Sequence, residues 1–262
     1  MEVILIIPLL LGWAAGLTVN YLADVLPITR SFSQPACLQC GSSIGWLDYL
    51  LFRACANGHP RKMRSWVVQA IMTALSVYIW NSPPVKLGYI IGLFLLIYFG
   101  IVFVIDLEHR LILHPTSIAG SILGLVVGWL KWGLKPALIG GLFGLTVMLA
   151  LYFFGVLFAR ARAKRMAAQG QEVDDEEALG AGDVILLTIL GLMLGWPFIW
   201  FGLLFGILLG GFFSLLLVLW LLVSRKYKSN ALMLFIPYGP YFIISAFLII
   251  FFPTFLAMIL PG

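Results

Sequence analysis

Long, uninterrupted apolar runs dominate this chain and restrict it to one class of fold. About 20 consecutive apolar residues suffice to cross the hydrocarbon core of a bilayer as a helix. Of the 262 residues, 62% are hydrophobic and 10% are charged. Because the runs are continuous and do not alternate between apolar and polar residues, they argue against a transmembrane β-barrel. The sequence therefore predicts an all-α polytopic membrane protein with about eight transmembrane helices.

Short polar segments and glycines delimit the eight expected spans. The sixth and seventh are divided only by Gly195-Trp196-Pro197. Glycines four residues apart, as at Gly12 and Gly16 or Gly140 and Gly144, are expected to let neighbouring helices approach closely in lipid. The expected spans are Val3–Val25, Ser65–Trp80, Leu87–Ile105, Pro115–Leu130, Pro136–Phe158, Asp183–Trp196, Phe198–Val223 and Leu232–Leu260.

Basic residues predict how these spans are oriented. Of the 16 lysines and arginines, all but Lys86, Lys131 and Lys135 fall on one side of the expected membrane. The positive-inside rule makes the richer side cytoplasmic and leaves both termini outside. The same bias accounts for the net charge of +5, so no nucleic-acid partner is needed to explain it. The first segment lacks a basic n-region and a cleavage site, and is expected to be an anchor and not a removable signal peptide.

The largest polar segment, residues 27–64, separates a first helix at residues 1–26 from a membrane domain at residues 65–262. This insert holds all three cysteines of the chain, in the spacing C-x2-C-x14-C-x3-H. Three thiolates and an imidazole make a closed tetrahedral set for zinc, and a metal would stabilise a segment too small to build much of a core. A disulfide is less favoured in a cytoplasmic insert, and free thiols beside an unrelated histidine are the alternative. The candidate ligands are Cys37, Cys40, Cys55 and His59.

Two aspartates at the ends of expected spans are the main candidates for chemistry. An ionisable residue at membrane depth costs roughly 2.5–3.5 kcal/mol on insertion scales and is a functional candidate by default. Asp106 follows the third span, and Asp183 opens the sixth, both on the expected cytoplasmic side. Gly180 and Gly182 precede Asp183 and permit backbone angles barred to other residues, so we expect a hinge there.

Each aspartate also has a simpler explanation. Asp106 could pair with Arg110 one helical turn later, and Asp183 could cap its own helix. A proton-coupled transporter could use the two acids as a relay. Their position at one membrane edge, away from the midplane, and the lack of an evident long internal repeat argue against that class.

Further along, the chain carries two more features with open interpretations. The cytoplasmic loop at residues 159–181 contains the acidic run 174–177, which either attracts a basic substrate segment or balances nearby arginines. Pro237, Gly239 and Pro240 interrupt the start of the last span. They predict either irregular backbone that binds an extended substrate or a helix that begins with proline in its first turn.

The motifs follow one another in an order that resembles the type IV prepilin peptidase family, a family of GxGD membrane aspartyl proteases with eight spans. The resemblance covers nearly the whole chain and implies that Asp106 and Asp183 are the catalytic pair. It rests on the stretch from Gly12 to Pro27, the Cys-x-x-Cys insert, Ile105-Asp106, Gly180-Ala181-Gly182-Asp183, and Ile236-Pro237-Tyr238-Gly239-Pro240-Tyr241.

The resemblance also implies a substrate and a location. The substrate would be a prepilin or pseudopilin, cut behind its basic leader at the cytoplasmic face of the bacterial inner membrane. A GxGD peptidase acting on other membrane substrates is the alternative. Two departures from the family pattern are the replacement of its usual fourth cysteine, for which His59 is the nearest substitute, and the lack of a Gly/Asn-rich stretch before the insert. The second bears on the family's other activity, methylation of the new N-terminus with S-adenosylmethionine.

Overall fold

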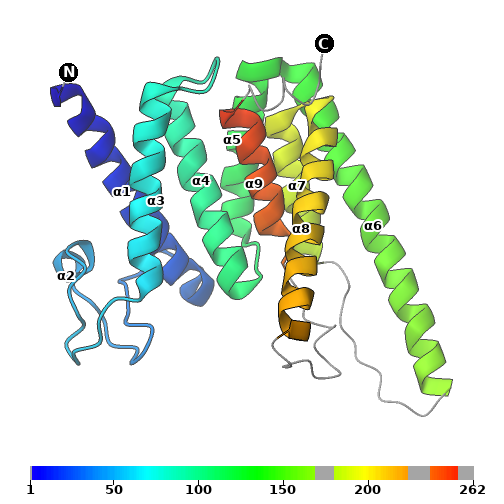
Figure 1. Ribbon diagram of the computed structural model, residues 1–262, viewed down its shortest axis with the longest axis horizontal. Helices are drawn as coiled ribbons and strands as arrows, with labels where there is room; N and C mark the ends of the chain where they lie inside the picture. Colours follow the sequence, from blue (N-terminus) through cyan, green and yellow to red (C-terminus); the bar gives the residue numbers. More distant parts are fainter. Residues whose placement is uncertain (1, 169–179, 224–236, 253–262) are drawn as a thin grey trace. The chain divides into compact units, whose positions relative to one another are not determined.

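The computed structural model describes residues 2–168, 180–223 and 237–252 (Figure 1). Within these residues the regular elements are α-helices, and one isolated bridge joins Ala36 to Ser43. This confirms the all-α class. The chain divides into two compact units, residues 1–119 with 247–262 and residues 120–246. The acidic run at 174–177, together with much of the loop at 159–181, lies outside the described residues.

In the first unit, three long helices pack on one another: α1 (Glu2–Thr29), α3 (Met63–Asn81) and α4 (Gly88–His109). Glycines set the close approach of α1 to α3. A Cβ atom on Gly12 would lie 2.6 Å from Ser76 Cβ, and one on Gly16 would lie 2.7 Å from Gln69 Oε1. Gln69 Nε2 in turn donates to Trp13 O at 2.6 Å. Here the small-residue spacing works as expected, bringing backbones close enough for polar side chains to bond across the pair.

The second unit is built around α7 (Ala181–Leu194), which packs against α6 (Leu134–Ala168) and α8 (Phe198–Val223). A Cβ atom on Gly191 of α7 would fall within about 3 Å of the backbone of Gly140 in α6, so these two helices also meet through glycines. Gly195, with φ 66°, ends α7, and α8 begins at Phe198 as expected. Two further helices, α5 (His114–Trp132) and α9 (Gly239–Phe251), contribute residues to both units.

Several of the described helices are apolar enough to cross a membrane. Four meet the length and composition required of a span, and α7 and α9 are shorter apolar helices. This confirms a membrane protein with several apolar helices, whereas the expected number of eight spans stays a prediction. The four are Leu5–Thr29, Gly88–His109, Leu134–Ala163 and Phe198–Leu221.

Some helix ends differ from those expected. The apolar run of the third span stops at Ile105, but α4 continues to His109, so Asp106 lies inside the helix and not in a turn after it. The helix extends because nothing in residues 107–109 opposes it until Arg110 adopts a left-handed conformation with φ 55°. The last expected span began at Leu232, and its described part is α9.

The insert between α1 and α3 contains one short helix, α2 (Trp46–Leu50), and a series of turns. Its small core consists of Cys37, Ile44, Tyr49 and Cys55, which are buried, and Tyr21 of α1 packs against them. Figure 1 shows α2 lying beside the end of α1 that leads into the insert. The insert therefore folds back onto α1.

Candidate functional site

Two tight turns bring the four predicted metal ligands together. In the first, Gly41 N–H donates to Cys37 O at 2.8 Å, and in the second, Gly58 N–H donates to Cys55 O at 2.8 Å. Both glycines have positive φ, 72° and 80°, a conformation that other residues adopt only with strain. Each turn thus presents a pair of ligands, Cys37 with Cys40 and Cys55 with His59, and we refer to the four as the Cys/His group.

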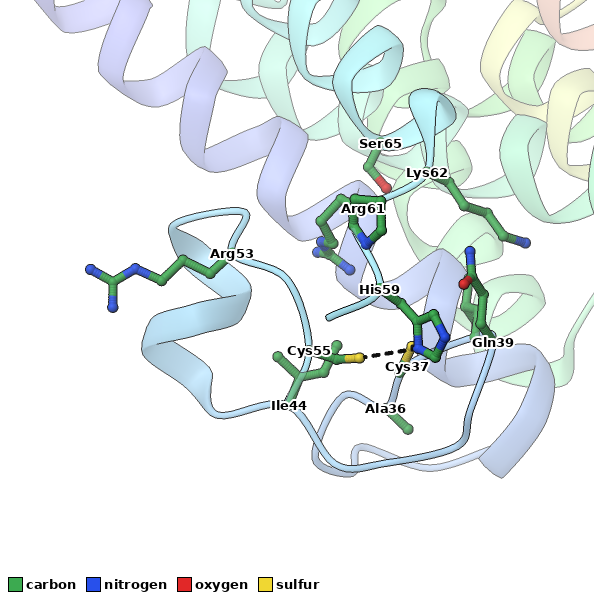
Figure 2. Close-up of a pocket in the computed structure, with 12 residues that line it drawn as sticks. Ala36, Cys37, Gln39, Ile44, Arg53, Cys55, His59, Arg61, Lys62 and Ser65 are labelled. Atoms are coloured by element: carbon green, nitrogen blue, oxygen red, sulfur yellow. Dashed lines mark hydrogen bonds between the residues drawn. The ribbon is translucent and has the colours of Figure 1, made fainter. Parts of the chain in front are cut away.

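The spacing of the ligand atoms fits a tetrahedral metal ion. All four atoms lie within 4.8 Å of one another. Cys40 Sγ is 3.8 Å from Cys55 Sγ. His59 Nδ1 is 3.4 Å from Cys55 Sγ (Figure 2) and 4.0 Å from Cys37 Sγ. With Zn–S bonds of about 2.3 Å, the sulfur atoms of a tetrahedral site stand about 3.8 Å apart. The predicted grouping is confirmed, and these residues could hold a metal ion.

The electrostatics of the Cys/His group favour the metal-binding thiolate form of two of its three thiols, because the pKa values of Cys40 and Cys55 are lowered whereas that of Cys37 is raised. The Ser42 hydroxyl, 3.1 Å from Cys40 Sγ, is the main influence that lowers the pKa of the Cys40 thiol to about 5. Hydrogen bonds to Cys40 and Cys55 raise the pKa of His59, because imidazolium is attracted to thiolate. Thiolate is the form that binds metal, and with this lowered pKa Cys40 is a thiolate at neutral pH.

Positive side chains line the pocket next to the Cys/His group. Arg53, Arg61 and Lys62 are among the lining residues, and Figure 2 shows Arg61 beside His59, whereas Arg53 and Lys62 extend away from Cys55. Three thiolates outweigh the charge of one divalent ion, so a loaded group would carry a net negative charge that Arg61 and Lys62 offset.

A buried charged network, which the sequence analysis did not single out, joins α1, α3 and α4 beside the insert. The Asp24 side chain is only 2% exposed and pairs with Arg64 and, at 3.4 Å, with Arg61 Nη1. Tyr49 Oη donates to Asp24 Oδ2 at 2.7 Å, and Arg64 Nη1 donates to Glu108 Oε2 at 2.7 Å. Asp24 is an acidic residue near the end of the first apolar run, so the argument that selected Asp106 as a functional candidate could have selected Asp24 as well.

Tyr49 connects this network to the core of the insert. The Arg61 guanidinium lies over the Tyr49 ring, 3.7 Å from its centroid, and Tyr49 packs with Cys37 and Cys55. Burial, followed by the negative charge of Asp24, raises the pKa of the Tyr49 phenol. Tyr49 therefore stays neutral and acts as a hydrogen-bond donor to Asp24.

Asp106 lies in the last turn of α4 and is 5% exposed. Its backbone oxygen accepts from Arg110 N–H at 2.9 Å, which closes the helix. His109, Arg110 and His114, which follow it, are exposed. Asp106 is thus buried at the C-terminal end of α4. It precedes by two residues Glu108, which Arg64 contacts.

Asp183 is the third residue of α7, where it was expected near a helix N-terminus. Its N–H donates to Gly180 O at 3.1 Å, and the residue is half-buried. Gly180 has φ −76° and ψ 143°, a conformation open to any residue, and Gly182 lies inside the helix. The expected glycine-only backbone angle is therefore not found at Gly180, while the role of these glycines as a hinge stays a prediction.

The start of the last apolar helix takes the simpler of its two expected forms. Gly239 begins α9 and Pro240 follows in its first turn, where a missing N–H costs nothing. Tyr241 N–H donates to Tyr238 O at 3.1 Å, the first hydrogen bond of that helix. The suggested role of Pro237, Gly239 and Pro240 in substrate binding stays a prediction.

Comparison with known families supplies one match. Residues 90–215 match the sequence model of the type IV leader peptidase family. The matched segment runs from α4 into α8 and contains both Asp106 and Asp183, whereas the Cys/His group lies outside it. Neither the curated proteins nor the solved structures contain a match to this chain.

Proposed function

The chain belongs to the type IV leader peptidase family, and we propose that it is an aspartyl endopeptidase that removes the basic leader from type IV prepilins or pseudopilins. The observation that carries the proposal is that the family match contains both aspartates found at ends of apolar helices, Asp106 in the last turn of α4 and Asp183 in the first turn of α7. We place cleavage at the cytoplasmic face of the bacterial inner membrane, on the strength of the distribution of lysine and arginine.

In the proposed mechanism the two aspartates act as a pair. Two carboxyl groups a few Å apart do not both ionise readily, so they share a proton and titrate together. The ionised partner removes a proton from water as the water attacks the scissile carbonyl, and the protonated partner donates to the carbonyl oxygen. The product of this step is a tetrahedral diol, and the enzyme forms no covalent bond to the substrate.

The positions of the aspartates on their helices assign the two roles. The N-terminus of a helix stabilises an anion, whereas the C-terminus disfavours one. Asp183 occupies the first turn of α7 and Asp106 the last turn of α4. Asp183 is accordingly the proposed base and Asp106 the proposed acid.

Zinc is the proposed metal of the Cys/His group, because a set of three thiolates and one imidazole suits it. Cys37, Cys40, Cys55 and His59 would complete its tetrahedral coordination and leave no position for substrate. The metal would therefore stabilise the insert and take no part in hydrolysis.

One reaction tests the proposed function. Purified enzyme in a lipid nanodisc is incubated with a prepilin, with and without S-adenosylmethionine, and the products are read by mass. We expect loss of the leader in both reactions, and an added methyl group with S-adenosylmethionine if the second activity is retained. Unprocessed prepilin with folded enzyme would reject the peptidase. Proton flux through liposomes that depends on Asp106 and Asp183 would favour the transporter.

A further inference from the structure

The insert exposes an apolar surface that its own fold does not cover. Its four members lie on or directly after α2, and we call them the α2 patch. Their exposed fractions are 51% for Trp46, 74% for Leu47, 43% for Leu50 and 60% for Leu51. Leu47, Leu50 and Leu51 follow the i, i+3, i+4 spacing that places side chains on one face of a helix. Four large apolar side chains on so small a segment indicate an interaction surface.

Aromatic contacts fix the position of the α2 patch along the axes of α1 and α3. The Trp46 ring lies 5.2 Å from that of Tyr21 in α1. Directly after the patch, the Phe52 ring lies 4.6 Å from Trp66 in the first turn of α3 and 6.0 Å from Trp13. Trp13 precedes the C-terminal end of α1 by roughly 24 Å along the helix axis, at 1.5 Å per residue. The Phe52 side chain therefore extends along α1 toward the part of that helix expected to span the bilayer.

The α2 patch continues an exposed apolar surface of α1 and α3 that is expected to face lipid. Trp13 is 41% exposed and Trp66 is 48% exposed, and both belong to the sides of α1 and α3 next to Phe52. Tryptophan and tyrosine gather where the hydrocarbon meets the headgroups, and Trp46, Tyr21 and Trp66 fit that belt. Any partner of the patch other than lipid would also have to displace lipid from α1 and α3.

The polar residues of α2 complete an interfacial arrangement. Asp48 and Arg53 form an exposed ion pair of 3.4 Å, with side chains 48% and 66% exposed. Such a pair is stable among headgroups and water and costly in hydrocarbon. A short segment with leucines and tryptophan on one side and an ion pair on another has the pattern of a helix lying in the plane of the membrane surface.

We infer that the insert is docked on the bilayer through the α2 patch, with Leu47, Leu50 and Leu51 in the boundary between headgroups and acyl chains. The occupant of the patch is the lipid of the leaflet on the insert's side. The Cys/His group is then held at a fixed height beside the membrane surface, since Tyr49 of α2 packs directly against Cys37 and Cys55. This inference does not depend on the peptidase activity.

Site-specific photo-crosslinking in the full chain tests the docking. Benzoylphenylalanine replaces Leu47 in one variant and Ser43, an exposed residue of the same insert, in a control variant. Both are irradiated in lipid nanodiscs and analysed by mass spectrometry. We expect lipid adducts in the position 47 variant and none in the position 43 variant. Equal lipid adducts at the two positions, or crosslinks from position 47 to a second copy of the chain, would overturn the inference.

Tryptophan fluorescence provides a second readout that needs only a conservative change. The difference between the emission of the wild type and of Trp46→Phe isolates the contribution of Trp46. We expect that contribution to be quenched by lipids brominated near the headgroup end of their acyl chains and shielded from aqueous iodide. Quenching by iodide alone would place Trp46 in water and contradict the docking.

Discussion

Arg64 Nη1 lies 2.7 Å from Glu108 Oε2, and this contact ties the first turn of α3 to the last turn of α4. The other terminal nitrogen of Arg64 pairs with Asp24 of α1. One arginine therefore connects three helices at the level of Asp106, which precedes Glu108 by two residues. The pairing fixes the helix end that carries a proposed catalytic group, so Arg64 is a positioning residue.

Replacing Arg64 by alanine is expected to cost stability and activity together. The change leaves Asp24 buried with only Arg61 and Tyr49 as partners, and removing one member of a buried charged set typically costs about 3–5 kcal/mol. We expect a lower unfolding temperature in detergent and slower cleavage of prepilin, which thermal unfolding and a kinetic assay would measure.

The matched control for Arg64 is Arg53→Ala, which removes the exposed pair with Asp48. Exposed pairs contribute about 0–1 kcal/mol, so this variant should unfold close to the wild-type temperature. Equal destabilisation by the two substitutions would contradict a special role for Arg64. Restored activity in Arg64→Lys, with Glu108 again paired, would support positioning through charge.

The Cys/His group is expected to bind about one zinc ion per chain, with all four ligands required. Cys37→Ser removes one thiolate, so we expect loss of the metal. We also expect faster proteolysis of the insert, because the bound metal stabilises its small core. Elemental analysis of the purified protein and limited proteolysis measure the two effects. Ser43→Ala, an exposed change in the same insert, should retain the metal. Purified wild-type protein without zinc would reject the assignment.

The Cys/His group and the charged network differ in how far the sequence reveals them. Cys37 with Cys40 and Cys55 with His59 are close in the chain, and each pair is formed by one tight turn, so their spacing alone predicts the group. Asp24, Arg64 and Glu108 are far apart in the sequence and meet only because three helices pack together. The apolar runs predict that these helices exist, but they do not specify which faces meet.

The reactivity of Cys40 in metal-free protein should depend on pH in an unusual range. Its pKa is lowered to about 5, chiefly by Ser42, so the thiolate persists at neutral pH. A lowered pKa stabilises the folded state above the ordinary thiol pKa, and this contribution is lost as the pH falls through about 5. We expect the rate of alkylation by iodoacetamide at Cys40 to fall with a midpoint near that value. Ser42→Ala should move the midpoint to higher pH, whereas Ser43→Ala should not. An ordinary thiol profile in the wild type would contradict the role of Ser42.

Asparagine at either proposed catalytic position should abolish cleavage while the protein still folds. Asp106→Asn removes the proposed acid and Asp183→Asn the proposed base, and each function typically contributes about 10²–10⁴-fold to a rate. Cleavage of prepilin at saturating substrate, read by mass, measures the loss. Asp48→Asn changes an exposed carboxylate of α2 and should cleave normally. Appreciable activity in either single variant would show that the two aspartates do not act as a catalytic pair.

Alanine in place of Gly191 should separate α6 from α7 and displace the helix that carries Asp183. A Cβ atom there would fall within about 3 Å of the Gly140 backbone, and backbone cannot move aside as a flexible side chain can. We expect a loss of about 1–3 kcal/mol in stability and slower cleavage. Gly211 of α8 offers the matched control, because among the described residues no side chain or neighbouring helix comes within 4 Å of the position a Cβ would take. Gly211→Ala should be neutral or stabilising by up to about 1 kcal/mol, since alanine favours a helix more than glycine does. Thermal unfolding of both variants in the same detergent decides the matter, and equal unfolding temperatures would mean that the α6–α7 contact tolerates a side chain.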